Sequence, residues 1–522
     1  MRVITDIRGS GPNLRVLVLL CLIVILGSAL RFYGLDRESL WTDELATWHT
    51  GSRESVSEVL SVVYDGGEGS HPPGYYVFMH FWQQLFGDSE WVLRFPAALA
   101  GVLTIPAVFL LGRRLYSDRE GLIAAALTAV MWAPVYYSQE ARMYSPLILF
   151  AVLTALFWLE VRRGLEEGRF PRGAAAGYAL SAAVAAYLHY FGLYLVAMQG
   201  IWMLLLFAFR GRALLRVFAL YGSVVLLYLP WARQTAERLL FGSNQPIAWL
   251  DRPDAGRPLE FLEFLFGRSE MIATAVLALL GFLLLRALYD GARGFAGGEG
   301  ADVRGFLASP GVLLALWLAV PFAGAYVLSL LGDPVLLFRT LLISAPAAYL
   351  LTARALARLP LPAGAQAAAT AAAAALLVLH LVFSMDYYSE PDKHQYREAV
   401  AYMAGNTPVP EETVVVGCGY RLDYLEYYFR REGLPLKFAH RACSGEHLPG
   451  AMEAISERNP RCVWYVRAHM RPNWRVIGSL AKEFELERVH RKKFKGVEVW
   501  IFRSERLPGD LAGERGSPGK PG

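Results

Sequence analysis

The stretch that decides the organisation of this chain is residues 36–49, with the sequence DRESLWTDELATWH. Two adjacent carboxylates, Asp43 and Glu44, lie between Trp41 and Trp48, directly after the first long apolar run. Tryptophan favours the boundary between membrane and water, so we expect the stretch to lie at one face of a bilayer. Carboxylates at such a boundary are costly unless they are paired or functional. A solvated helix start after a membrane span is the alternative interpretation.

The composition is that of a polytopic membrane protein. The chain has 522 residues, of which 55% are hydrophobic and 13% aromatic, and its mean hydropathy is +0.33. This is too apolar for a soluble protein of this size. The net charge of +5 does not indicate nucleic-acid binding, because the basic residues form short clusters between apolar runs. The first lysine is Lys393, and this shift in composition marks a boundary near residue 386.

About eleven segments are apolar and long enough to span a membrane. They are 14–35, 94–112, 120–137, 143–161, 173–190, 191–209, 214–231, 271–289, 310–331, 336–355 and 364–385. Residues 73–87 are also apolar, but a span there would break the alternation of basic loops, so we predict an interfacial helix.

Basic clusters fall on every second side of these segments, and that side is expected to be cytoplasmic. The clusters are Arg2/Arg8/Arg15, Arg113/Arg114/Arg119, Arg162/Arg163/Arg169/Arg172, Arg210/Arg212/Arg216, Arg286/Arg293/Arg304 and Arg354/Arg358. The pattern predicts a multi-pass membrane protein with a cytoplasmic N-terminus and an extracytoplasmic C-terminal domain.

The predicted domains are a transmembrane domain over 1–385, whose first outer loop covers 36–93, and a small extracytoplasmic α/β domain over 386–505. In the latter we predict helices at 396–403, 422–432, 451–458 and 475–484, and strands at 413–417, 435–438, 462–466 and 496–502. The tail, 506–522, is rich in Gly and Pro and is predicted to be disordered. Two of Cys418, Cys443 and Cys462 could form a disulfide, and the sequence does not say which.

Polar residues recur at the outer ends of separate predicted spans. A helical bundle brings such ends together, so we expect one polar, outward-facing site. Its candidate members, in chain order, are Asp43, Glu44, His71, Glu140, Arg142, Tyr144, His189 and Arg339.

Five stretches of the sequence resemble motifs of the GT-C superfamily of membrane glycosyltransferases. LRFYGL at 30–35, followed by LWTDE at 40–44, resembles its first outer loop. HPPGYY at 71–76, RFPAALAG at 94–101 and YSQEARMY at 137–144 are similar to motifs of the bacterial family that contains protein O-mannosyltransferases and lipid A aminoarabinose transferases (glycosyltransferase family 39-like). FRTLL at 338–342 resembles a late family element, but Thr340 stands where the family usually has Tyr.

The resemblance implies sugar transfer from a polyprenyl-phosphate donor to an envelope glycan, lipid or protein acceptor, on the outer face of a bacterial inner membrane. It implies that Asp43 is the base of an inverting transfer, with Glu44 as a second catalytic candidate. A lipid phosphate is a good leaving group that needs charge stabilisation, which arginines provide. Arg142, Arg339 and Arg94 are therefore candidates for donor phosphate binding, and His71, Glu140, Tyr144 and His189 for substrate binding.

Structural interpretations of the same residues stay open. Asp43 could cap a helix, Glu140 could pair with Arg142 to lock the turn, and His189 could be an interface histidine satisfied by backbone carbonyls. Glu44 could be a boundary charge.

Two further interpretations of the sequence stay open. A divalent metal could bind to Glu140 and His71, with no cofactor otherwise indicated. The alternative function is a transporter or flippase of lipid-linked sugars, which would favour charges near the bilayer midplane and two related halves.

Overall fold

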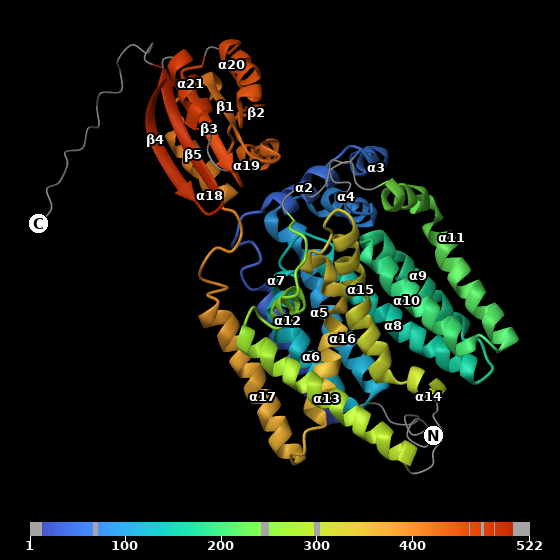
Figure 1. Cartoon of the computed structure of the whole chain (residues 1–522). Helices are drawn as coiled ribbons and strands as arrows, with labels where there is room; N and C mark the ends of the chain where they lie inside the picture. The colour runs from blue at the N-terminus through green and yellow to red at the C-terminus, as the bar shows by residue number, and fades with distance from the viewer. Residues whose placement is uncertain are drawn as a thin grey trace, which may run out of the picture. The chain divides into compact units, whose positions relative to one another are not determined.

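The structure is a computed structural model that describes residues 13–65, 71–241, 250–296, 303–458, 460–470, 474–484 and 486–504. The predicted disordered tail, 506–522, and the basic residues Arg2 and Arg8 lie outside the described residues. The chain forms two compact units (Figure 1). The first, helical unit contains residues up to 35 and 50–388, and the second, α/β unit contains 36–49 and the chain from 389 onwards.

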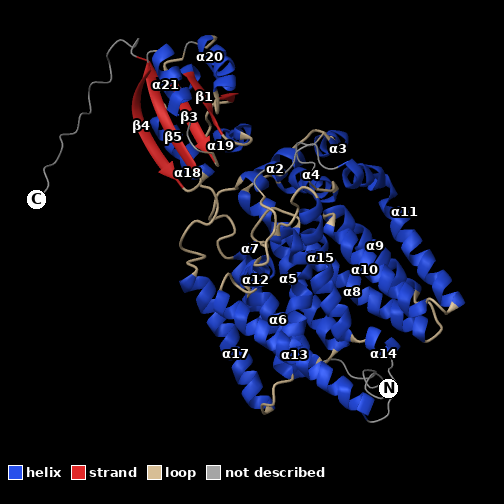
Figure 2. Ribbon diagram, in the orientation of Figure 1, coloured by secondary structure: helices blue, strands red, loops and turns tan. Residues whose placement is uncertain are grey.

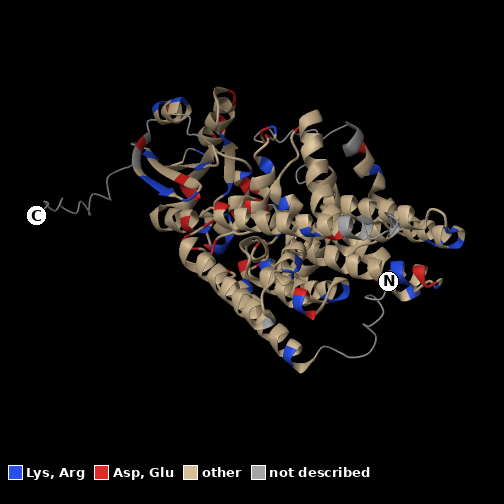
Figure 3. Ribbon diagram, turned by 60° about the horizontal axis from the view of Figure 1, so that its bottom comes forward, with Lys and Arg blue, Asp and Glu red and all other residues tan. Residues whose placement is uncertain are grey.

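The helical unit confirms the prediction of a mainly helical membrane protein. Eight described helices are long and apolar enough to cross a membrane. Their full bounds are α1 Leu14–Phe32, α5 Glu90–Leu115, α8 Tyr144–Glu166, α11 Gly211–Phe241, α13 Glu270–Ala296, α15 Pro310–Leu331, the 3₁₀ turn Phe338–Ser344 with α16 Ala345–Ala357, and α17 Ala363–Leu379 with the π-helical turn His380–Ser384. Charged residues are sparse along the middle of the helices and are found mostly towards their ends (Figure 3).

The three other predicted spans form shorter helices. Residues 120–137 divide into α6 (Asp118–Val130) and α7 (Trp132–Tyr136) because Met131 is extended. The hairpin over 173–209 becomes α9 (Arg172–Leu188) and α10 (Phe191–Phe207). The described helices that remain are α3 Val56–Tyr64, α4 Gly74–Phe86, α12 Arg257–Leu265 and α14 Val303–Leu307. The segment predicted as an interfacial helix is thus helical, as α4.

The α/β unit contains a five-stranded sheet in the order β2-β1-β3-β5-β4 (Figure 2). Its strands are β1 Thr413–Cys418, β2 Phe438–Arg441, β3 Cys462–Ala468, β4 Leu486–Phe494 and β5 Val497–Ser504. β1 pairs in parallel with β2 and β3, and β5 pairs antiparallel with β3 and β4. Its helices are α18 Tyr396–Asn406, α19 Glu426–Arg431, α20 Leu448–Ser456 and α21 Trp474–Glu483. The unit also holds most of α2 (Thr42–Gly51).

The predicted elements of this unit are mostly confirmed, with two errors at the sheet edges. The prediction of a strand at 435–438 was wrong, because β2 begins only at Phe438. β4 was missed because its sequence, LERVHRKKF, is rich in charge, and an edge strand tolerates such residues where a central strand does not.

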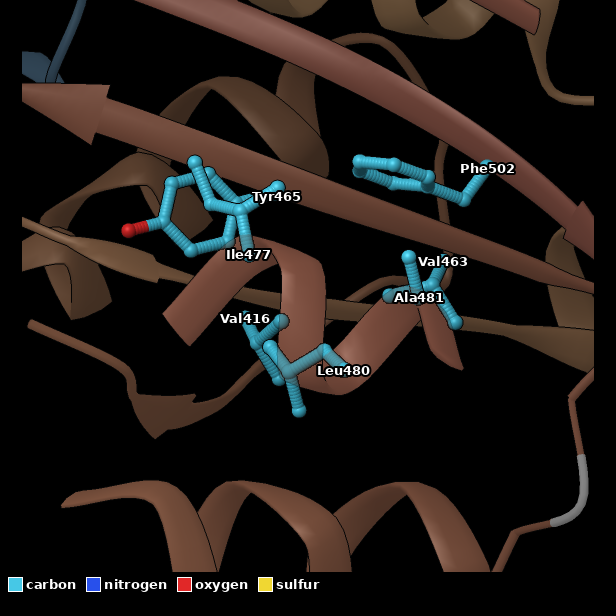
Figure 4. A pocket seen from close by; sticks show the side chains of 7 residues that line it. All are labelled: Val416, Val463, Tyr465, Ile477, Leu480, Ala481 and Phe502. Carbon is cyan, nitrogen blue, oxygen red and sulfur yellow. The ribbon is translucent and has the colours of Figure 1, made fainter. Parts of the chain in front are cut away.

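The sheet packs against helices through an apolar core that includes Val416, Tyr465 and Trp500. Figure 4 shows a small apolar pocket there, between the sheet and α21. The Tyr465 hydroxyl, which is polar, donates to the Ala442 carbonyl at 2.9 Å. The pocket is a gap in core packing rather than a binding site. The disulfide joins Cys418 to Cys443, and Cys462 is a buried free thiol.

Candidate active site

The YSQEARMY turn between α7 and α8 is fastened to the end of α1 in the helical unit. Gln139 Nε2 donates to the carbonyls of Arg31 and Tyr33 at 3.0 and 2.9 Å, and Tyr387 Oη donates to Gln139 Oε1 at 2.8 Å. Gly101 lies under the turn, since a Cβ added there would lie 2.0 Å from Ser138 Oγ. This close approach explains the glycine that ends the RFPAALAG motif.

The turn places two charged side chains in the interior of the helical unit. Glu140 is completely buried and Arg142 is 2% exposed. Arg142 Nη1 donates to Tyr76 Oη at 3.2 Å, and its guanidinium carbon lies 5.9 Å from the centre of the Tyr76 ring. The HPPGYY motif therefore supplies a direct partner to the arginine of the YSQEARMY motif. Sequence reasoning named Arg142 but did not identify Tyr76 as its partner.

Two histidines from distant loops meet beside this turn. The rings of His71 and His189 have centroids 5.0 Å apart, and the His189 ring lies 6.3 Å from that of Tyr144. His189 occupies the turn between α9 and α10 and is 3% exposed. Its Nδ1 accepts a hydrogen bond from the Phe191 backbone N–H at 3.1 Å. The interpretation that backbone carbonyls satisfy His189 was therefore wrong. Its Nε2 is buried without a hydrogen-bond partner among the described residues.

Arg339 belongs to the same neighbourhood. The guanidinium groups of Arg142 and Arg339 both interact electrostatically with the His189 imidazole. Both arginines are therefore close enough to act on one imidazole. Arg339 and Glu140 also interact electrostatically with Tyr137. The helical unit thus brings together residues from four loops, as the sequence predicted: His71, Glu140, Arg142, Tyr144, His189 and Arg339.

Two further arginines of this unit have different surroundings. Arg94, on α5, is 1% exposed and donates from Nη1 to the Leu35 carbonyl at 2.9 Å, so it supports the chain just after α1. Arg268 was not identified from the sequence. Its guanidinium carbon lies 3.8 Å from the centre of the Trp132 ring, and it interacts electrostatically with Tyr137. The only sequence signal for Arg268 was its position in a long polar loop.

Asp43 and Glu44 lie in the first turn of α2, within the α/β unit. Glu44 Oε2 is 3.1 Å from Lys393 Nζ, and both side chains are almost completely buried. Asp43 is partly exposed and interacts electrostatically with His394, His469 and Tyr396. These neighbours of Asp43 were missed, because they lie about 350 residues or more further along the chain.

The structure also bears on a metal centre. Among the described residues, no group of three or more His, Cys, Asp or Glu side chains is placed to hold a metal ion. His71 and Glu140, the residues proposed as ligands, therefore belong to no such group in that part of the chain.

Comparison with known proteins relates these units to membrane glycosyltransferases. Residues 70–232 match the family described as dolichyl-phosphate-mannose-protein mannosyltransferase. A segment of 109 residues is 35% identical to undecaprenyl phosphate-alpha-4-amino-4-deoxy-L-arabinose arabinosyl transferase of Edwardsiella ictaluri, a match that covers 20% of this chain and 19% of that protein.

Solved structures match over almost the whole chain. ArnT from Cupriavidus metallidurans in the apo state has a TM-score of 0.56 at 15% identity, covering 93% of this chain and 98% of that one. The same protein bound to undecaprenyl phosphate has a TM-score of 0.53 at 16% identity, covering 95% and 99%. AglB from Archaeoglobus fulgidus, in complex with an inhibitory peptide and a dolichol-phosphate, has a TM-score of 0.51 at 14% identity, covering 95% and 75%. The chain is therefore a multi-pass membrane protein with the fold of the GT-C superfamily of glycosyltransferases.

Proposed function

We propose that the protein transfers a sugar from a polyprenyl-phosphate donor to an acceptor at the outer face of a bacterial inner membrane. The observation that carries this proposal is the convergence of the buried Arg142 and His189 with the half-buried Arg339 in the helical unit. Two guanidinium groups provide charge-assisted, bidentate hydrogen bonds to phosphate oxygens. ArnT from Cupriavidus metallidurans, which has the same fold, has been solved with undecaprenyl phosphate bound. This supports a polyprenyl-phosphate donor for the present chain.

In the proposed reaction, an acceptor hydroxyl attacks the anomeric carbon of the donor sugar. The bond between that carbon and the phosphate oxygen breaks, and the lipid phosphate leaves with the electron pair. Asp43 takes the hydroxyl proton, and Arg142 and Arg339 compensate the charge that develops on the phosphate. Attack from the face opposite the leaving group inverts the anomeric configuration. The N-terminus would be cytoplasmic and the α/β unit extracytoplasmic.

Glu44 receives a structural role in this proposal. A carboxylate that is buried against the Lys393 ammonium is stabilised in its charged form and cannot reach a substrate hydroxyl without breaking that pair. His71, Tyr144, Glu140 and His189 are assigned to substrate binding in the helical unit. Arg94 is assigned to support of the fold, because it donates to the Leu35 carbonyl from the interior of the helical unit.

Transfer is favoured over transport of lipid-linked sugars. The family and the relative matched in sequence are transferases by name. Glu140, Arg142 and His189 lie in turns between helices, and Arg339 lies in the 3₁₀ turn before α16. A transporter would instead place charges within discontinuous helices near the bilayer midplane.

The experiment that tests the proposal uses the purified full chain in lipid. It is incubated with a panel of radiolabelled polyprenyl-phosphate monosaccharides and an envelope extract as acceptor. Wild type should consume one donor, and Asp43→Asn should not. Asp65→Asn, which changes an exposed acid of the segment after α3, is the matched control and should behave as wild type. Equal donor consumption by Asp43→Asn and wild type would refute the assignment of the base, and no consumption of any donor would refute the reaction.

A further inference from the structure

A chain of hydrogen bonds reaches the first residue of α2 from the α/β unit. Thr42 Oγ1 lies 3.0 Å from Tyr396 Oη and 2.9 Å from His469 Nε2. With Nε2 as the acceptor, the Thr42 hydroxyl donates to His469 and accepts from Tyr396, so all three groups are satisfied at once. Asp43 follows Thr42 directly, so the orientation of this first turn decides where the Asp43 carboxylate points.

His469 is held in an unfavourable backbone conformation. Its φ of 63° lies in the left-handed region, which is uncommon for residues other than glycine. Such strain persists only where the surrounding structure fixes the residue, and it often accompanies a functional position. In this conformation the imidazole lies within hydrogen-bonding distance of Thr42.

A second imidazole restricts the first. The rings of His394 and His469 meet edge to face with centroids 4.0 Å apart. Gly496, in the turn between β4 and β5, leaves room for His394, since a Cβ there would lie 1.7 Å from His394 Cδ2. His394 Nδ1 is buried without a hydrogen-bond partner among the described residues. The turn is therefore shaped around this imidazole.

The charged groups that act on this pair come from three parts of the unit. The pKa of His394 is lowered to about 4: burial has the largest effect, His469 and Lys495 act in the same direction, and Asp43 opposes them. Burial also lowers the pKa of His469, and Asp43 opposes that effect. Both imidazoles are therefore neutral near neutral pH, which is the form in which Nε2 can accept from Thr42.

We propose that His469 is a positioning residue for Asp43. His469 acts through the Thr42 hydroxyl and is itself held in place by the His394 imidazole. The α/β unit then has a direct part in sugar transfer, because it fixes the direction of the base. This inference rests on the role of Asp43 given under the proposed function.

A double-mutant cycle tests the inference. The full chain in lipid is assayed as wild type, Thr42→Val, His469→Ala and the double variant, with the polyprenyl-phosphate monosaccharide that the panel identifies. Each single change should lower kcat about tenfold, as for the loss of one well-placed hydrogen bond, while the donor KM changes by no more than about twofold. The double variant should be no slower than either single one.

Two further variants separate positioning from general damage. His469→Gln retains a hydrogen-bonding side chain and should restore most of kcat, whereas His490→Ala, on the exposed face of β4, should leave kcat unchanged. The inference would be overturned if the decrease in kcat of the double variant were the product of the two single decreases. It would also be overturned if the variants raised the donor KM instead of lowering kcat.

Hydrogen exchange of a peptide covering 40–48 gives a readout that does not need activity. Its amides should exchange faster in His469→Ala and Thr42→Val, and no faster in the double variant. Unchanged exchange in His469→Ala would overturn the inference even if no donor is consumed. Equal donor consumption by Asp43→Asn and wild type would instead refute the assignment of the base in the proposed function, so the two failures are distinguishable.

Discussion

The ammonium of Lys393 lies 3.1 Å from the Glu44 carboxylate, with 3% and 0% of the two side chains exposed. Lys393, the first lysine in the sequence, thus pairs with Glu44, one of the two adjacent carboxylates between Trp41 and Trp48. Taking both charges out of water is costly, and the pair persists because each compensates the other. The Glu44–Lys393 ion pair therefore connects α2 to the chain segment that leads into α18.

Removing one partner of this pair should destabilise the protein more than removing both. Glu44→Gln or Lys393→Met should each cost about 3–5 kcal/mol, because one buried charge is left uncompensated. The double variant Glu44→Leu/Lys393→Met should recover much of that loss. Thermal unfolding in detergent checks this, with Arg233→Met in the exposed Arg233–Glu237 pair as the control, which should cost less than about 0.5 kcal/mol. Losses of similar size in the double and single variants would contradict the expected compensation.

The sequence predicted the helical part well because its signals are local. A membrane span is a run of apolar residues, and the turn at 137–144 is recognisable from contiguous motif residues, so both could be located without knowledge of packing. The grouping of His71, Arg142, His189 and Arg339 followed from one additional rule, that a bundle gathers the ends of its helices.

The surroundings of Asp43 and Glu44 could not be predicted in the same way. Lys393, His394 and His469 carry no motif and lie far away in the chain, and only the folded α/β unit brings them to α2. The disulfide was ambiguous for a related reason. Three cysteines allow three pairings, and only the juxtaposition of the end of β1 with the residues after β2 selects Cys418 and Cys443.

Loss of this disulfide should weaken the α/β unit. The bridge closes a loop with a sequence separation of 25 residues, and constraint of the unfolded chain over such a loop is worth about 3 kcal/mol. Cys443→Ser should therefore lower the unfolding temperature and make the unit more sensitive to protease. Cys462→Ala changes a thiol outside the bridge and should not alter the effect of a reducing agent. If a reducing agent destabilised Cys443→Ser as strongly as wild type, the assigned pairing would be wrong.

Acid should destabilise the α/β unit through His394. Burial depresses the pKa of His394 from 6.5 to about 4 in the folded protein, and His469 acts in the same direction. The unfolded chain therefore binds the proton more readily than the folded protein does. The stability that neutral His394 contributes is complete above the pKa of the unfolded state, and it is lost as the pH falls towards the pKa of the folded state. Unfolding temperatures at about pH 7 and about pH 5 should differ less in His394→Gln than in wild type. His490→Gln is the control for a histidine on β4, and equal acid sensitivity of His394→Gln and wild type would contradict this assignment.

Arg142 should contribute to donor binding through both its charge and its geometry. Arg142→Met should weaken binding of a polyprenyl phosphate by about ten- to hundredfold, as for the loss of a charge-assisted hydrogen bond. Arg142→Lys keeps the charge but loses the planar guanidinium that contacts Tyr76, so its affinity should fall between those of wild type and Arg142→Met. Tyr76→Phe removes only the hydroxyl that accepts from Nη1 and should have a smaller effect than either change. Binding of radiolabelled undecaprenyl phosphate to the purified variants measures this order directly, with Arg233→Met as a control for the loss of an exposed guanidinium. Undiminished binding to Arg142→Met would remove this arginine from the phosphate site and leave it as a support for the turn that carries Glu140.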